Sequence, residues 1–162
     1  MRILGYKVDK FGLYGIDAVI KCSELNIDDT ISFIVDTGAS ITSISTVDIL
    51  RLKGMDYDYS DLKPVEKGDG VVGIDGNIES VDTFYLPKTK LIFINEDTGK
   101  NILEYVNDGR VLRHKNINPD TRQLLESRMK IKLGDHFYTS LLGMDILKTY
   151  KISFSSLTAT LE

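Results

Sequence analysis

The feature that most constrains the fold is the segment 31–40, in which an apolar run ends in Asp36, Thr37 and Gly38. The β-branched and aromatic residues at 33–35 predict a buried strand. An acidic side chain directly after a buried strand is costly unless it is paired, hydrogen-bonded or neutralised. Gly38 allows a sharp turn and close approach of another chain, although Asp and Gly are also common in ordinary turns. The triplet alone is therefore compatible with either a functional loop or a simple strand-turn.

Two later segments narrow this choice. Residues 71–78 read Val-Val-Gly-Ile-Asp-Gly-Asn-Ile, and their Asp-Gly pair is typical of a two-residue hairpin turn within a predicted hairpin from about 65 to 86. Residues 141–147 read Leu-Leu-Gly-Met-Asp-Ile-Leu, which predicts a short apolar strand, a glycine and then a helix over about 145–150. With 31–40, these segments resemble, in the correct order, the active-site loop, flap and apolar-apolar-Gly strand of retroviral-type (retropepsin-like) single-lobe aspartic proteases. The resemblance covers about residues 1–94 and 130–162.

The resemblance implies a fold and a set of site residues. The expected fold is all-β, a closed-barrel-like single lobe with one or two short helices, formed by residues 1–162 as one domain. A partly helical insertion at about 95–129 is atypical of the family. The family pattern assigns catalysis to Asp36, Thr37 and Gly38. It assigns substrate binding to the following loop residues and to the flap, namely Ala39, Ser40, Gly73, Ile74, Asp75 and Gly76.

The chemistry of peptide hydrolysis explains why such a subunit must pair. Two carboxylates held close together cannot both ionise, so one acts as general base on water while the other protonates the carbonyl oxygen. The chain supplies one suitable aspartate, Asp36, so the second must come from another copy across a two-fold axis. The sequence thus predicts a homodimeric aspartic endopeptidase that binds an extended peptide. The alternative is a catalytically silent module of the same fold that holds extended peptides or mediates dimerisation.

Two other motifs would indicate different functions, but their sequence context does not support them. Residues 68–73 fit G-x-G-x-x-G, but a dinucleotide site needs a strand before the motif and a helix after it, and neither is predicted. A second Asp-Thr-Gly stands at Asp97, Thr98 and Gly99. Its polar flanks, and the lack of room for a second lobe, predict a turn there.

Composition excludes several other classes. The net charge of −4 does not favour nucleic-acid binding, and no apolar run approaches the length of a membrane span. The single cysteine, Cys22, cannot form an intrachain disulfide, which favours a reducing compartment and predicts a cytoplasmic protein. His114, His136 and Cys22 are scattered without ligand spacing, so neither a metal nor a cofactor is expected.

The remaining pattern predicts further elements. Strands are expected over 2–9, 13–21, 41–44, 90–94, 129–133, 152–154 and 157–161, with a polar connection over 24–30. A helix is expected over about 47–53 with Thr46 as N-cap and Gly54 after its end, and another beginning near Asn118 and Pro119. Residues 110–132 hold seven Lys or Arg against two Asp or Glu. This local excess predicts either a basic lid that recruits an acidic partner or substrate, or a solvated surface.

Overall fold

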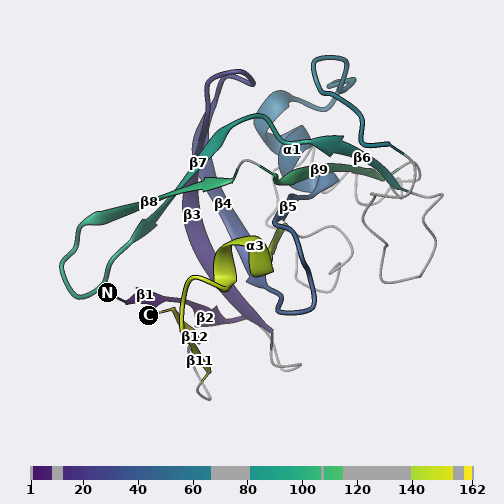
Figure 1. The fold of residues 1–162 in the computed structure, drawn as a ribbon. Helices are drawn as coiled ribbons and strands as arrows, with labels where there is room; N and C mark the ends of the chain where they lie inside the picture. Colours follow the sequence, from purple (N-terminus) through teal and green to yellow (C-terminus); the bar gives the residue numbers. More distant parts are fainter. Residues whose placement is uncertain are drawn as a thin grey trace.

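The computed structural model describes residues 2–8, 13–66, 81–106, 108–114, 140–154 and 159–161. These residues form β-strands and two short helices, and the main sheet curls into a half-barrel (Figure 1). The prediction of an all-β lobe with one or two short helices is therefore confirmed.

The main sheet places the Asp36 strand near its middle. Its members are β2 (Tyr6–Lys7), β3 (Tyr14–Cys22), β4 (Ile27–Val35), β5 (Ser43–Ile44), β6 (Val81–Tyr85), β7 (Thr89–Ile94), β8 (Asn101–Val106), β9 (Arg110–His114) and β10 (Leu141–Leu142). Their order is β6-β9-β5-β10-β4-β3-β7-β8, and β2 pairs with β3. The β10–β4 and β5–β9 pairs are parallel, whereas the other pairs are antiparallel.

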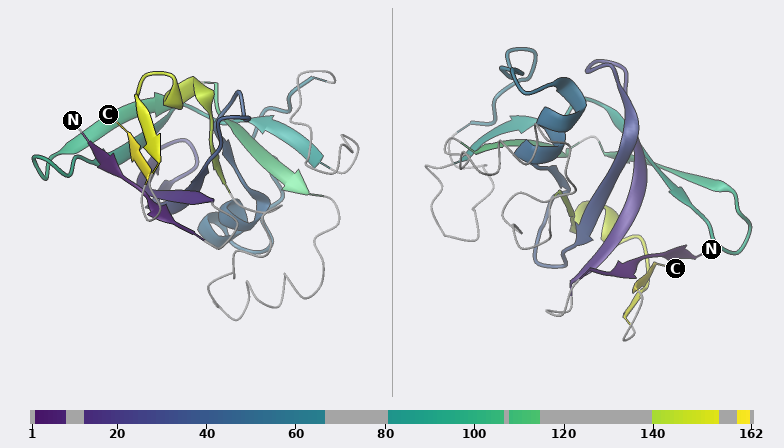
Figure 2. Two further views of the ribbon diagram at one scale, coloured as in Figure 1. Left: turned by 90° about the horizontal axis from the view of Figure 1, so that it is seen from below. Right: turned by 180° about the vertical axis from the view of Figure 1, so that it is seen from behind.

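A second, three-stranded sheet joins the two ends of the chain. Strand β1 (Ile3–Leu4) pairs with β12 (Ala159–Leu161), which in turn pairs with β11 (Ile152–Phe154), all antiparallel. The two termini consequently lie close together in every view (Figure 2). Strand β11 confirms the strand predicted over 152–154, and β12 lies within the strand predicted over 157–161.

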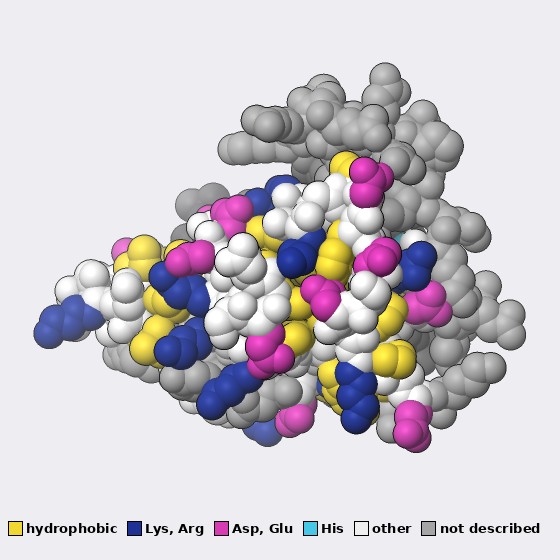
Figure 3. All heavy atoms as spheres, turned by 90° about the horizontal axis from the view of Figure 1, so that it is seen from above, with side chains coloured by type: hydrophobic (Ala, Val, Ile, Leu, Met, Phe, Trp, Pro, Cys, Tyr) yellow, Lys and Arg dark blue, Asp and Glu magenta, His cyan; other side chains and the backbone are white. Residues whose placement is uncertain are grey.

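The core follows from alternation along the central strands. On β3 the buried positions recur at every second residue, and β4 turns Ile31 and Phe33 to the same interior. Each such side chain contributes about 1.5–3 kcal/mol when it is fully buried. Elsewhere the surface mixes both signs of charge, as Lys, Arg, Asp and Glu side chains intersperse over the described part of the face in Figure 3.

Helix α1 (Thr46–Lys53) begins one residue before the predicted helix. Its N-cap is Ser45 rather than Thr46, because Ser45 Oγ accepts a hydrogen bond of 3.1 Å from Asp48 N. The Thr46 hydroxyl instead donates to the carbonyl oxygen of Leu112 on β9, 2.8 Å away. Gly54 follows the helix with a φ of 103°, as expected for a glycine that ends a helix.

Other predicted boundaries also move. The connection predicted over 24–30 is wrong in its second half, since β4 already begins at Ile27 and pairs it with Cys22 across a turn at 23–26. Backbone pairing in the sheet thus overrides the polar composition of 27–30. The predicted strand 41–44 is confined to β5, and helix α3 (Met144–Leu147) begins at Met144 and ends before Tyr150.

Residues 101–106 and 110–114 lie within the range predicted as an insertion, yet they form β8 and β9 of the main sheet. The helix predicted near 118, the strand over 129–133 and the tip of the 65–86 hairpin lie outside the described residues. Neither described helix has the length and apolarity needed to cross a lipid bilayer.

Candidate active site

Asp36 lies at the carboxyl end of β4, where this strand runs beside its parallel neighbour β10. Ile34 N donates to Ser140 O at 2.9 Å, and Asp36 N donates to Leu142 O at 3.1 Å. Both bonds join segments that are about a hundred residues apart in the chain. The backbone of Asp36 is therefore fixed by the sheet itself and not by its own loop alone.

The loop after Asp36 folds back on the carboxylate. Gly38 N donates to Asp36 Oδ1 at 2.8 Å, and Ala39 N donates to Asp36 O at 3.2 Å. A Cβ at position 38 would lie only 3.1 Å from Asp36 Oδ1, so a glycine suits this close turn. The Asp36 side chain is half-buried, whereas Thr37, Gly38 and Ser40 are exposed. The carboxylate is consequently held in place but open to one side.

Helix α3 holds the far end of this loop. Met144 N donates to Ala39 O at 2.8 Å, and Asp145 N donates to Ser40 O at 3.1 Å. These are N–H groups of the first helical turn, which have no partner within their own helix. A Cβ on Gly143 would lie 2.5 Å from the carbonyl carbon of Ile41. Only a glycine allows α3 to approach the loop this closely.

A buried threonine connects the same two segments. Thr42 donates to Asp145 Oδ1 from both its backbone N, at 2.9 Å, and its hydroxyl, at 2.7 Å. The hydroxyl also accepts a bond of 3.0 Å from Gly143 N. Sequence reasoning missed Thr42 and Asp145, since neither residue carries a signal until the fold pairs them across 103 positions.

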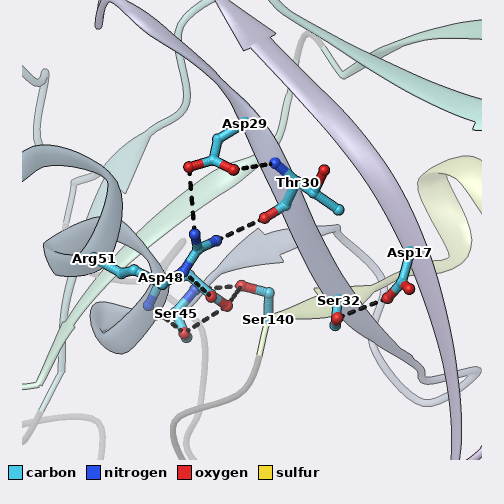
Figure 4. Close-up of polar contacts among 8 residues, drawn as sticks. All are labelled: Asp17, Asp29, Thr30, Ser32, Ser45, Asp48, Arg51 and Ser140. Carbon is cyan, nitrogen blue, oxygen red and sulfur yellow. Dashed lines mark hydrogen bonds and ion pairs between the residues drawn. The ribbon is translucent and has the colours of Figure 1, made fainter. Parts of the chain in front are cut away.

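A second polar network supports the strands below the loop (Figure 4). Ser140, which precedes β10, donates from its hydroxyl to Asp48 Oδ2 at 2.6 Å and accepts from Ser45 N at 3.0 Å. Arg51 of α1 donates to Thr30 O on β4 at 2.7 Å. Helix α1 is thereby tied to both β10 and β4. Burial raises the pKa of Asp48, and the hydrogen bond from Ser140 partly offsets this.

The structure brings together part of the predicted site. Asp36, Thr37, Gly38, Ala39 and Ser40 form one loop. The remaining predicted binding residues, at 73–76, lie outside the described residues.

The second Asp-Thr-Gly is a turn, as predicted. It joins β7 to β8, and Gly99 N donates to Asn95 O at 2.7 Å while Asp97 N donates to Asn95 Oδ1 at 3.0 Å. Gly99 adopts a φ of 64°, and Asp97 lies 3.4 Å from the Arg2 guanidinium. Local contacts close this turn at the end of a hairpin, and Arg2 contacts it from the N-terminal segment.

Among the described residues, no group of three or more His, Cys, Asp or Glu side chains is arranged to hold a metal ion. Cys22 is buried and has no disulfide partner. His114 is half-buried at the end of β9, with Nδ1 2.8 Å from Thr46 Oγ1. The described part of the chain therefore offers Asp36 as its clearest candidate for chemistry.

Comparison with known proteins gave one kind of match. No family model matches the chain, and no curated protein matches it. Among solved structures, the chain is similar to the crystal structure of a retropepsin-like aspartic protease from Rickettsia conorii. The similarity covers 99% of this chain and 89% of that one, with 19% sequence identity and a TM-score of 0.49.

Proposed function

We propose that this chain is one subunit of a homodimeric aspartic endopeptidase in which Asp36 from two copies activates water. The observation that carries the proposal is the placement of Asp36. The Asp36 carboxylate follows a central strand. The backbone of Asp36 is hydrogen-bonded to β10, and the loop after it is hydrogen-bonded to α3. Such a carboxylate is positioned without a flexible segment, which is what acid–base catalysis requires.

The proposed reaction divides two roles between identical residues. One Asp36 carboxylate is ionised and takes a proton from water, while the other keeps its proton and gives it to the peptide carbonyl. In each subunit Oδ1 accepts from Gly38 N, which leaves Oδ2 without a hydrogen-bond partner among the described residues. We propose that Oδ2 contacts the attacking water in one subunit and carries the proton in the other. The two titrations belong to the pair and not to either residue.

The second copy is required because the described residues place no other carboxylate in hydrogen-bond contact with Asp36. A two-fold axis through the site would bring two identical loops together. Thr37 and Gly38 are exposed on this loop, as surfaces that meet a partner must be. The loop itself is therefore the part of the dimer contact that the proposal specifies.

The proposed substrate is a protein or peptide in extended conformation. It would lie as an added strand along Ala39 and Ser40, held by main-chain hydrogen bonds for which each of these carbonyls keeps a second lone pair after its bond to helix α3. The predicted flap residues 73–76 would close over it. We also propose a cytoplasmic location, since Cys22 is a free and buried thiol.

The test compares wild type, Asp36→Asn and Asp97→Asn for cleavage of an unfolded protein between about pH 3 and 7. The oligomeric state of each is measured in the same buffers by light scattering. We expect cleavage by the wild-type dimer and by Asp97→Asn, and its loss in Asp36→Asn. A well-folded wild-type dimer that cleaves nothing at any pH would contradict the proposal and favour the silent peptide-binding module.

A further inference from the structure

One row of side chains runs from the carboxyl end of β4, two residues before Asp36, to the far edge of the sheet. Its members are successive register partners on β4, β10, β5, β9 and β6, namely Ile34, Leu141, Ser43, Arg110 and Tyr85. Register partners project to the same face of a sheet. The residues next to three of them, Ile44, Val111 and Phe84, contact the hydrophobic core. The row therefore lies on the face that points away from this core.

Arg110 is a buried cation without a counterion on this row. Its side chain is only 7% exposed, and Nη1 donates to the carbonyl oxygens of Asp108 and Gly109. Its Nε is buried and has no hydrogen-bond partner among the residues that the structure describes. No described carboxylate lies within ion-pair distance of this guanidinium. An arginine buried in this way is costly unless an anion binds to it.

Ser43 adds a second unpartnered group beside the first. It is the register partner of Arg110 across the parallel β5–β9 pair, and its side chain is 1% exposed. Its hydroxyl also lacks a hydrogen-bond partner within the described part of the chain. Because the great majority of buried polar groups are hydrogen-bonded, two such donors on adjacent strands point to an absent acceptor.

A second cation, Lys63, lies near this pair. The Tyr85 ring lies 4.7 Å from the Arg110 guanidinium and 5.7 Å from Lys63 Nζ. Tyr85 N donates to Lys63 O at 2.9 Å, which fixes Lys63 beside the row. Two cations thus share one aromatic ring. A carboxylate, with two acceptor oxygens and one negative charge, complements both the donors and the charge.

We infer that Arg110 and Ser43 form a subsite for the carboxylate of a Glu or Asp side chain in the substrate. The inference rests on the proposed function and names the class of peptide that the proposed protease would select. Three strand spacings separate β4 from β9, roughly 14 Å in all. An extended peptide advances about 3.3 Å per residue, so the acidic residue would lie roughly four residues from the cleaved bond.

The experiment measures binding separately from cleavage. Fluorescent eight-residue peptide libraries carry Glu, Gln or phosphoserine at one fixed position at a time, with mixed residues elsewhere. Their affinities are measured for Asp36→Asn, and for Asp36→Asn combined with Arg110→Met, Arg110→Lys or Arg113→Met. Arg113 is the matched control, because it is an exposed arginine on the same strand.

We expect a preference for Glu over Gln of on the order of 10- to 100-fold at one position, as a charge-assisted hydrogen bond provides. Arg110→Met should abolish this preference, Arg110→Lys should weaken it, and Arg113→Met should keep it. Arg110→Met should change the melting temperature little, since the loss of two hydrogen bonds to carbonyl oxygens is offset by the removal of a charge that is costly to bury. A strongly lowered melting temperature in both Arg110 variants would make Arg110 structural and overturn the inference.

Equal binding of Glu and Gln libraries at every position, or no binding of either, would also overturn it. Tighter binding of phosphoserine than of Glu would reassign the site to phosphate and overturn the carboxylate assignment. The proposed function fails separately, by absence of cleavage in wild type. An acidic preference that depends on Arg110, found in a protein that cleaves nothing, would support the subsite while it contradicts the protease.

Discussion

The chain uses the triplet Asp-Thr-Gly twice, and the two copies differ in everything except their letters. The first, at 36–38, follows β4 near the middle of the main sheet. The second, at 97–99, lies in the turn between β7 and β8, at the free end of a projecting hairpin (Figure 1). One copy is surrounded by other parts of the chain, whereas the other meets little beyond its own hairpin and the N-terminal segment.

Their hydrogen bonds show the same contrast. The loop after Asp36 is held by backbone bonds from Met144 and Asp145, more than a hundred positions away. The turn around Asp97 is closed mainly by Asn95, through its carbonyl and its side chain, and Arg2 contacts it from outside, where its carbonyl oxygen accepts from Glu96 N at 2.8 Å. The comparison teaches that the triplet supplies only a turn. The Asp36 carboxylate is suited to catalysis because the backbones of a central strand and of a helix hold the turn around it, whereas a single chain end contacts the Asp97 turn from outside.

The largest expected effect is on activity. Asp36→Asn should lower the rate of peptide cleavage by about 10²- to 10⁴-fold, the range for removal of a general acid or base. The free energy of unfolding should change by no more than about 0.5 kcal/mol, since asparagine Oδ1 can still accept from Gly38 N. Asp97→Asn should leave the rate unchanged. The cleavage rate of one peptide and urea unfolding are measured for both variants. An equal loss of cleavage rate in Asp36→Asn and Asp97→Asn would show that the two Asp-Thr-Gly copies do not differ in function.

The next effect concerns the glycines that each region needs. Gly143→Ala places a Cβ 2.5 Å from a backbone carbon of Ile41, which should destabilise the protein by about 3 kcal/mol. Gly99→Ala meets no atom within 4 Å and suffers only from its φ of 64°, at a cost of about 1–2 kcal/mol. Urea unfolding of both variants measures the difference. A larger destabilisation by Gly99→Ala than by Gly143→Ala would show that the Asp36 loop adjusts to an added Cβ more easily than the hairpin turn does.

A smaller effect is expected from the two threonines that brace these segments. Thr42→Val leaves Gly143 N buried without its acceptor and should cost about 2 kcal/mol. It should also lower the rate of cleavage about tenfold, because a loop displaced by a fraction of an ångström loses catalytic geometry. Thr98→Val removes one exposed hydroxyl, which accepts a hydrogen bond of 3.3 Å from Lys100 N. This variant should change neither the free energy of unfolding nor the rate of cleavage measurably. An unchanged rate of cleavage in Thr42→Val would mean that the Asp36 loop keeps its geometry without the hydrogen bonds of Thr42.

Local sequence patterns predict the parts of this fold that local physics decides. The apolar run at 33–35 predicts β4, the alternation in 13–21 predicts β3, and the polar flanks of Asp97 predict its turn. Each of these signals depends on residues within a few positions of one another. The predicted N-cap of α1 is wrong by one residue because Ser45 and Thr46 are both good caps.

Contacts between distant segments could not be predicted in this way. The bonds of Thr42 with Asp145 depend on where β10 and α3 return beside the loop. The pairing of Ser43 with Arg110 likewise depends on β9 joining the main sheet, although it lies in the range predicted as an insertion. Polar residues of these types occur throughout the chain, so sequence alone does not distinguish the ones that meet.

The smallest expected effect is the pH dependence of stability that arises from Asp48. This residue belongs to the buried polar network beneath the Asp36 loop, and the Asp97 turn has no such network among the described residues. Burial raises the pKa of Asp48 above its ordinary 3.8, while Ser140 and Arg51 act in the opposite direction. The folded protein therefore holds this proton more tightly than the unfolded chain. The contribution of Asp48 to stability is fully present below about pH 3.8 and is lost as pH rises through the folded-state pKa.

Because an asparagine side chain cannot titrate, the free energy of unfolding of wild type minus that of Asp48→Asn should fall as pH rises from about 3 to 6. Arg51→Met should move this fall to higher pH, because it removes the positive charge that lowers the pKa of Asp48. Urea unfolding at half-unit steps of pH measures both curves. A difference that rises with pH would mean that the hydrogen bonds from Ser140 and Ser45 outweigh burial, so that the network under the Asp36 loop is strongest when Asp48 is ionised.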